Sequence, residues 1–319
     1  MSERERVIIF GGAGFIGSHL VEDLLAHGHF VRAFDKTRGD WRNLAAVADR
    51  VETVEGDFVN RVEVRQALDG CTTAIHLVSA TLPSSSNENP AYDIESNVIS
   101  TLNLLDECRE AGVKRVLFIS SGGTVYGPAH RLPIPEDHPT EPACSYGIGK
   151  LAIEKYLALY GRLYGLSSAV LRFSNPFGER QNPAAAQGAV AVFLGRVHRG
   201  EPIDLWGDGS AVRDYLYITD GVRAFRRVLE TPDASGVFNV GRGVGTSLTE
   251  LIDAIGRVTG RKVIVNRLPG RPLDVPANVL DTSRLTALTG WRAEVDLEEG
   301  LARTWAWMTG DEPVAVGTP

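Results

Sequence analysis

The chain is poor in cysteine, has no long apolar run and carries no excess of basic residues, and each shortage excludes a class of function. Its three cysteines (Cys71, Cys108 and Cys144) are odd in number and lack metal-ligand spacing, so we expect reduced thiols and no metal site. A formal net charge of -7 argues against nucleic acid as a partner. The apolar run 7–10 is too short for a signal segment or a membrane span, so we expect a cytoplasmic protein that binds no membrane.

A glycine run, with Gly11, Gly14 and Gly17 three residues apart, follows this apolar run and precedes an amphipathic stretch, 15–26. Strand, glycine turn and helix in this order are typical of a dinucleotide-binding loop. The first glycine permits the turn, the second lets the backbone approach a pyrophosphate, and the third lets the helix pack close to the sheet. The competing interpretation is a glycine turn that only eases helix–strand packing.

Asp35 follows the next predicted strand, 30–34, and stands 18 residues after Gly17. A carboxylate there accepts hydrogen bonds from the adenosine ribose and repels a 2′-phosphate, so the pattern favours NAD over NADP. Arg38 lies nearby and keeps NADP open as the alternative. Asp57 and Phe58, after the third predicted strand, are candidates to flank the adenine.

Short apolar runs alternate with amphipathic stretches in the first half, whereas loops rich in Pro, Gly, Asn and Asp dominate beyond Phe173. We therefore predict an α/β protein, with a Rossmann doubly wound parallel sheet and a second, smaller α+β substrate domain. The predicted cofactor domain spans 1–172 with a return segment at 214–245, and 173–319 is mainly the substrate domain. Helices are predicted near 15–26, 93–110, 146–164, 189–198, 219–229, 248–258 and 297–308.

Tyr146 and Lys150 form a Tyr-x-x-x-Lys pair on a predicted helix, 129 residues after Gly17. A phenol has an ordinary pKa of about 10 and is a poor base at neutral pH. An ammonium group four residues later lies on the same helical face and can stabilise the phenolate. An isolated pair of this kind would be an ordinary helix surface, but the glycine run upstream favours a catalytic interpretation.

With these residues the chain resembles the extended short-chain dehydrogenase/reductase family, in particular the nucleotide-sugar epimerases and dehydratases typified by UDP-glucose 4-epimerase. The resemblance extends over nearly the whole chain. Its further motifs are Asn97-Val98, Thr101-Leu102-Asn103-Leu104-Leu105, Ile119-Ser120-Ser121, Val125-Tyr126-Gly127, Arg172-Phe173-Ser174-Asn175-Pro176-Phe177-Gly178, Gly207-Asp208-Gly209, Arg213-Asp214-Tyr215, Phe238-Asn239-Val240-Gly241, Arg271-Pro272-Leu273-Asp274 and Gly290-Trp291.

The resemblance implies an NAD-dependent enzyme that inverts C4 of a UDP-hexose through a transient 4-keto sugar. Tyr146 would be the base and Lys150 would lower its pKa and contact the nicotinamide ribose. The implied cofactor-binding residues are Gly11, Gly14, Phe15, Ile16, Gly17, Asp35, Lys36, Asp57, Phe58, Leu77, Val78, Ser79, Asn97, Ser120, Tyr146, Lys150 and Phe173. The implied substrate-binding residues are Thr81, Ser121, Gly122, Thr124, Tyr146, Asn175, Leu205, Arg213, Arg271 and Asp274.

The third catalytic position departs from the family pattern, because Gly122 stands where relatives have a serine or threonine. We take Thr124 as its replacement and Ser121 as the second choice, although either hydroxyl could instead bond only to the backbone. Gly123 and Thr124 also stand where the family's sugar dehydratases carry an Asp-Glu acid/base pair. Dehydration is therefore not expected.

The resemblance further implies a homodimer, in which two long helices near 93–110 and 146–164 form a four-helix bundle with those of the partner. The substrate is expected to be a UDP-sugar, with a TDP-sugar as an alternative. Another nucleotide-sugar oxidoreductase (a 4-reductase, or a uronate 4-epimerase or decarboxylase) remains the second enzymatic interpretation. A dinucleotide-sensing protein without turnover is the non-enzymatic one, and Gly122 is the only residue that favours it.

Overall fold

The computed structural model describes residues 5–185, 187–270 and 275–311, and it contains a seven-stranded sheet whose paired strands all run parallel. From one edge to the other the strands are β10 (Gly236–Val240), β6 (Ser167–Phe173), β5 (Arg115–Ser121), β4 (Thr73–His76), β1 (Arg6–Phe10), β2 (Phe30–Asp35) and β3 (Glu52–Glu55). Strand order reverses beside β1, so this is the predicted Rossmann doubly wound sheet.

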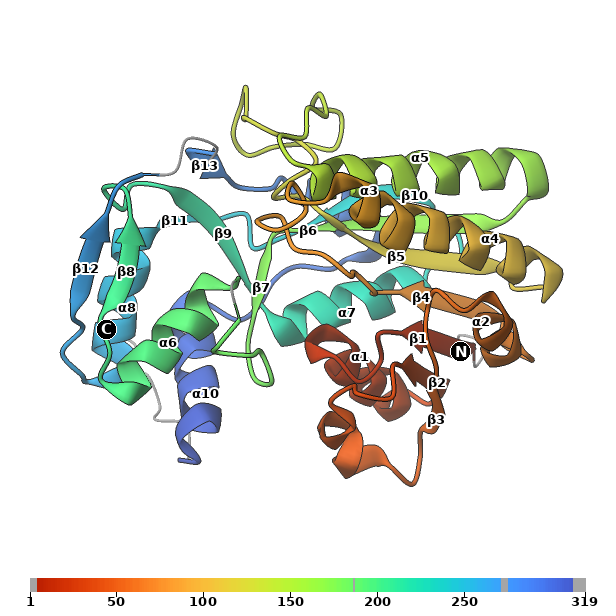
Figure 1. The fold of residues 1–319 in the computed structure, drawn as a ribbon, viewed down its shortest axis with the longest axis horizontal. Helices are drawn as coiled ribbons and strands as arrows, with labels where there is room; N and C mark the ends of the chain where they lie inside the picture. The colour runs from red at the N-terminus through yellow and green to blue at the C-terminus, as the bar shows by residue number, and fades with distance from the viewer. Residues whose placement is uncertain (1–4, 186, 271–274, 312–319) are drawn as a thin grey trace.

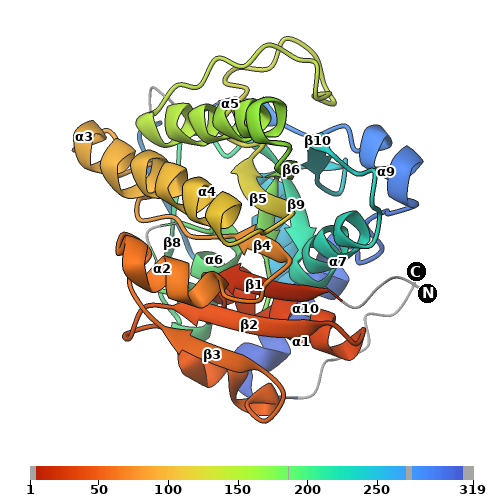
Figure 2. The same ribbon diagram turned by 90° about the vertical axis from the view of Figure 1, so that its right-hand side faces the viewer.

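Helices cover both faces of this sheet (Figure 2). One face carries α2 (Arg61–Leu68), the continuous helical segment α3 (Pro90–Asp93), η2 (Ile94–Ile99, a π-helix) and α4 (Ser100–Glu110), and then α5 (Ser145–Tyr164). The other face carries α1 (Phe15–Ala26) and α7 (Ile218–Leu229), which pack against each other. Because both faces are covered, successive residues of β1, β4 and β5 are buried without alternation.

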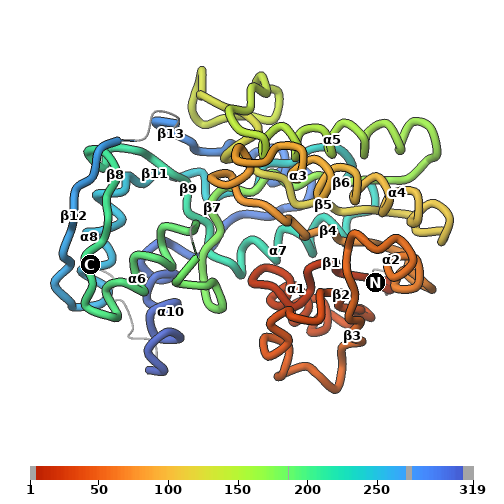
Figure 3. The backbone as a smooth tube through the Cα atoms, viewed as in Figure 1, coloured from red at the N-terminus to blue at the C-terminus, as the bar shows by residue number. Residues whose placement is uncertain are grey.

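The second, smaller part of the molecule lies at one end of the large sheet (Figures 1 and 3). It contains β7 (Asn175–Phe177), α6 (Ala189–Arg199), β8 (Ile203–Trp206), β9 (Val212–Tyr217), β11 (Gly245–Ser247), α8 (Leu248–Thr259), β12 (Val265–Leu268), β13 (Ala277–Asn278) and α10 (Leu297–Thr309). The short helices η1 (Trp41–Val47) and α9 (Ser283–Thr289) complete the described elements. The domain bounds given above, 1–172 with a return segment at 214–245 and 173–319, stay a prediction.

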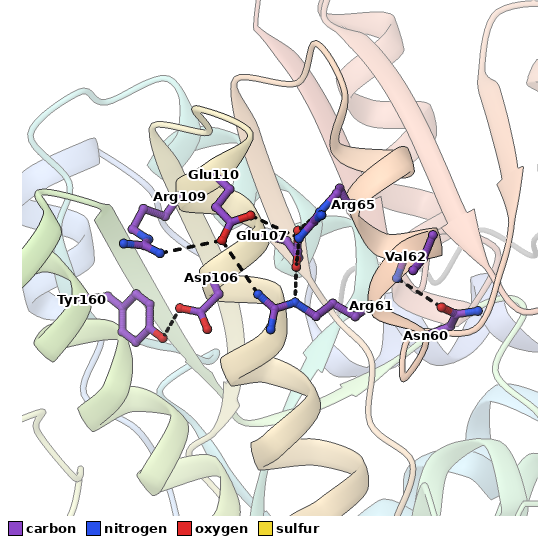
Figure 4. Close-up of polar contacts among 9 residues, drawn as sticks. All are labelled: Asn60, Arg61, Val62, Arg65, Asp106, Glu107, Arg109, Glu110 and Tyr160. Carbon is purple, nitrogen blue, oxygen red and sulfur yellow. Dashed lines mark hydrogen bonds and ion pairs between the residues drawn. The ribbon is translucent and has the colours of Figure 1, made fainter.

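The sequence did not predict α2, a short helix that buries Val64, Ala67 and Leu68 in the core and forms ion pairs with α4 (Figure 4). Asn60 begins the helix by accepting a hydrogen bond from the Val62 N–H at 3.1 Å. Glu107 is fully buried and accepts from both Arg61 and Arg65. The pKa of Glu107 is lowered by its hydrogen bond to Arg65, which keeps this buried carboxylate charged.

No helix among the described residues is both long and apolar enough to cross a membrane. The described ranges also contain no cluster of three or more His, Cys, Asp or Glu side chains arranged to hold a metal ion.

Candidate active site

The glycine turn between β1 and α1 forms a cradle that side chains would fill. Gly11 has a φ of 87°, which favours glycine, and a Cβ at Gly17 would lie 2.0 Å from the Gly11 carbonyl oxygen. Gly14 is the N-cap residue of α1 and provides no side-chain cap. Phe15 and Ile16 open the helix, so its first N–H groups point from the turn toward an anion site.

Asp35, at the end of β2, bonds directly to this turn. Its Oδ2 accepts from the Ala13 N–H at 3.0 Å and its Oδ1 accepts from the Lys36 N–H at 2.9 Å. Burial raises the pKa of Asp35, and these two backbone donors oppose the shift. The carboxylate is thus fixed at the strand end where a ribose would lie.

The side chain of Phe58 packs in the core rather than in an open adenine site. Its ring is 8% exposed and stacks on His76, with ring centroids 4.8 Å apart. Any adenine contact by Phe58 would therefore come from its backbone. Asp57 Oδ1 accepts from the Val59 N–H at 3.1 Å, which shapes the turn after β3.

The segment after β4 lies against the glycine turn, because a Cβ built at Gly11 would be 3.4 Å from Leu77 Cβ and 3.5 Å from the Val78 nitrogen. Ser79 Oγ donates to the Thr81 carbonyl at 3.2 Å. Asn97, in η2, accepts from the Ala80 N–H at 2.9 Å and so holds this segment in place.

Two further predicted cofactor residues are buried at the ends of neighbouring strands. Ser120 donates to Glu154 at 2.5 Å, and Glu154 also forms a buried ion pair with Arg172 at 2.6 Å. Phe173 is 2% exposed and stacks on Phe225. Both therefore support the strand ends through packing and hydrogen bonds.

Tyr146 and Lys150 lie on the first turns of α5, over the ends of β4 and β5. Lys150 is 5% exposed, donates to the Ile119 carbonyl at 3.1 Å and lies 5.5 Å from the centre of the Tyr146 ring. Burial lowers the pKa of Lys150 to about 8, although Asp93 and Glu154 oppose this. Burial raises the pKa of Tyr146 to about 12, and its hydrogen bond with Ser79 opposes the rise.

Desolvation, rather than the charge of Lys150, is the largest cause of the shift in the Tyr146 pKa. It acts on both groups and favours their neutral forms.

Gly122 lacks a side chain because Leu280 occupies its place. A Cβ at Gly122 would lie 2.6 Å from Leu280 Cδ1, and Leu280 is fully buried. Among the residues that the structure describes, Thr124 Oγ1 is buried and has no hydrogen-bond partner, so this hydroxyl is available to a ligand. Ser121 ends β5 and is half-buried.

Four predicted substrate residues are already engaged within the protein. Asn175 donates to the Asp214 carbonyl at 3.2 Å, and Thr81 donates to the Asp93 carboxylate. Leu205 is 2% exposed and belongs to the core. Arg213 donates to the Val212 and Val275 carbonyls, both at 2.8 Å. The two remaining predictions, Arg271 and Asp274, lie outside the described residues.

Sequence reasoning gave no site role to Asp93 or Asn87, and it connected the loop from Ser79 to Ser86 with the sugar but not with α5. Asp93, Ser86 and Asn87 hold the start of that helix. Ser86 Oγ accepts from the Tyr146 N–H at 3.1 Å, and Asn87 Oδ1 accepts from the Ser145 N–H at 2.9 Å. A single acidic residue at a buried helical position was the only available signal for Asp93.

Three features lie at the same edge of the sheet: the glycine cradle, the fixed carboxylate at the end of β2 and the Tyr–Lys pair. Together they define a dinucleotide-dependent oxidoreductase site. Residues 7–241 match the profile of the NAD dependent epimerase/dehydratase family. The chain belongs to this family, and its cofactor is NAD.

Individual relatives match over almost the full chain. It is 38% identical over 303 residues to UDP-glucose 4-epimerase of Mycolicibacterium smegmatis, covering 94% of this chain and 97% of the relative. Its fold matches UDP-glucose 4-epimerase of Thermotoga maritima with UDP-glucose (TM-score 0.90, 35% identity, 95% and 98% coverage). It also matches UDP-glucose 4-epimerase of Thermus thermophilus with NAD (TM-score 0.88, 36% identity, 96% and 99% coverage).

Proposed function

We propose that this chain is an NAD-dependent UDP-sugar 4-epimerase that interconverts UDP-glucose and UDP-galactose through a 4-keto sugar. The observation that carries the proposal is the pairing of half-buried Tyr146 with buried Lys150 on α5, at the same edge of the sheet as the glycine cradle. The three epimerases that match over most of the chain support the same activity.

Tyr146 is the general base in this mechanism. It takes the proton from the sugar 4-hydroxyl while C4 loses a hydride, and it returns the proton once the 4-keto sugar has presented its other face. NAD held by the glycine cradle and Asp35 would supply the hydride acceptor and a positively charged ring that favours the phenolate. Lys150 adds the second positive charge and is fixed by the Ile119 carbonyl.

The cradle at Gly11 to Gly17 fits the pyrophosphate of NAD, and Asp35 fits its adenosine ribose. The uncapped N-terminus of α1 supplies the donors, and a side chain at Gly17 would close the cradle. A 2′-phosphate would meet the fixed carboxylate of Asp35, so the site suits NAD rather than NADP.

Thr124 replaces the hydroxyl that is missing at Gly122. Its Oγ1 has no hydrogen-bond partner among the described residues, and a Cβ at position 122 would meet Leu280. We assign Thr124 Oγ1 to the sugar 4-oxygen, with Ser121 as the second candidate. Asn175, Arg213, Arg271 and Asp274 are assigned to the nucleoside diphosphate, for which guanidinium forks are suited.

The active form is proposed to be a homodimer that buries α4 and α5 against those of a second copy. Apolar side chains stand exposed along α5 at Ile148 (54%), Tyr156 (38%) and Leu163 (60%). Their spacing of eight and seven residues places them in one stripe on the helix.

The proposed location is the cytoplasm. Cys71, Cys108 and Cys144 are free cysteines, as expected in a reducing compartment.

The test is incubation of the purified protein with a panel of UDP- and TDP-sugars, followed by chromatographic identification of the products. We expect UDP-glucose and UDP-galactose to interconvert without net consumption of NAD. Replacing Tyr146 by Phe should lower the rate by about 10²–10⁴-fold while NAD stays bound. Unchanged substrates across the panel would contradict the proposal, and stoichiometric use of reduced cofactor would indicate a reductase instead.

A further inference from the structure

The catalytic helix α5 begins without a cap of its own. Its N-cap residue, Cys144, makes no side-chain cap hydrogen bond. Instead, the first two N–H groups, those of Ser145 and Tyr146, donate to Asn87 and Ser86 from a distant loop. The position of Tyr146 therefore depends on a segment about sixty residues earlier in the chain.

Asp93 joins that segment to the same helix. Its carboxylate is 1% exposed, and its Oδ2 accepts from Ser145 Oγ at 2.7 Å. Its Oδ1 accepts from Thr81 and, at 3.0 Å, from Asn97. These donors are all neutral, so the negative charge of Asp93 is not cancelled by a hydrogen-bonded cation among its contacts.

The charge of Asp93 lies close to Lys150 and affects the pKa of both Lys150 and Tyr146. A Cβ built at Gly149 would lie 3.7 Å from Asp93 Oδ2, which places the carboxylate against the turn that carries Lys150. Asp93 opposes the lowering of the Lys150 pKa and contributes to the raising of the Tyr146 pKa. The interruption of the helix by η2 directly after Asp93 is a local irregularity of the kind found at functional sites.

We propose that Asp93 is a positioning residue of the epimerase: it ties the loop from Thr81 to Asn87 to the start of α5, and its charge sets the pH range in which Tyr146 and Lys150 work. The inference rests on the proposed function. Asp93 connects this loop with the helix that carries Tyr146.

Other charged or titratable groups also face Lys150. Glu154 lies one turn further along α5 and opposes the lowering of the Lys150 pKa, whereas His76 on β4 is kept neutral by burial. Glu154 is already paired with Arg172 at 2.6 Å. Cys144, the N-cap residue of α5, also contributes to the raised pKa of Tyr146, and more than Asp93 does. Asp93 is the group that acts on both Tyr146 and Lys150, so its removal should move the proton equilibria of both.

Asp93→Asn tests the charge, because it keeps the shape and removes one negative charge. Loss of that charge makes both Tyr146 and Lys150 easier to deprotonate, so both limbs of the pH profile of kcat/KM should move to lower pH by at least about half a unit. Glu95→Gln, which removes an exposed charge two residues away, is the matched control and should leave both limbs in place. Limbs that coincide with those of the unmodified protein would overturn the role of the charge.

Ser145→Ala tests the positioning and does not depend on the folding of the first variant. It removes the hydrogen bond between Asp93 and α5 but keeps the charge, so kcat should fall at least about fivefold while both limbs stay in place. An unchanged kcat would overturn the positioning role.

A titration without turnover separates failure of this inference from failure of the proposed function. Tyrosinate absorbance of the NAD-bound protein, measured against the Tyr146→Phe variant, reports the ionisation of Tyr146 alone. Asp93→Asn should shift that ionisation to lower pH even if no sugar is converted. No shift would contradict the inference whatever the enzyme's substrate.

Discussion

At the scale of single residues, the burial of Lys150 should appear as a pH dependence of stability. Its pKa is about 8 in the folded chain against an ordinary 10.5, so the unfolded state binds more protons between these values. The free energy of unfolding should therefore rise with pH across this window, by about 1.4 kcal/mol per pH unit from this group. Lys150→Met should lack that rise when cofactor-free protein is unfolded in urea. Parallel curves for both proteins would show that the ammonium is not desolvated.

The pair of Gly122 and Leu280 gives a second prediction. Gly122→Ser should destabilise the protein by about 1–3 kcal/mol, because the new Cβ meets Leu280. Leu280→Ala alone should cost about 2–5 kcal/mol by leaving a cavity. The double variant should be more stable than the sum of the two costs predicts, by at least about 1 kcal/mol in urea unfolding with NAD present. Additive costs would show that the two positions do not share the same space.

At the scale of elements, the exposed stripe of α5 predicts the oligomeric state. Leu163→Glu should shift the protein from dimer to monomer in analytical ultracentrifugation, because a charge would be buried in the helix bundle. Leu288→Glu changes a similarly exposed leucine on α9 and should leave the dimer intact. If both variants sediment as the unmodified protein does, α5 is not the interface.

The sequence predicted the long elements well, because their periodicity follows directly from which faces are buried. The predicted helices 15–26 and 146–164 correspond to α1 and α5, the first with the same bounds and the second beginning one residue earlier. The helix predicted from 93 begins at Pro90, because Asn89 caps it by accepting from the Tyr92 N–H at 3.1 Å. The helix α2 was missed because its apolar stripe is short, only Val64, Ala67 and Leu68, and because its ion pairs with Glu107 of α4 are tertiary contacts.

The candidate site was predictable where a motif has a local physical cause. The glycine cradle and the Tyr–Lys pair are of this kind, since turn geometry and helical spacing act within a few residues. The bonds of Asp93 and Ser86 to the start of α5 join segments more than fifty residues apart, and no local pattern encodes them. The packing of Leu280 into the place of a side chain at Gly122 is likewise a tertiary effect.

At the scale of the whole molecule, the large sheet carries the glycine cradle and Tyr146. The smaller part carries β9, and Arg213 on this strand is hydrogen-bonded to the Val275 carbonyl. In the proposed mechanism the sugar lies between the two parts, with its C4 beside Tyr146.

The most direct test of this account is the fate of a deuterium label at C4 of UDP-glucose. Incubation of UDP-[4-²H]glucose with the protein, followed by mass spectrometry and NMR of the products, should give UDP-galactose that keeps the deuterium at C4. Loss of the label to water, or its replacement by a solvent proton, would contradict a hydride that is removed and returned within one site.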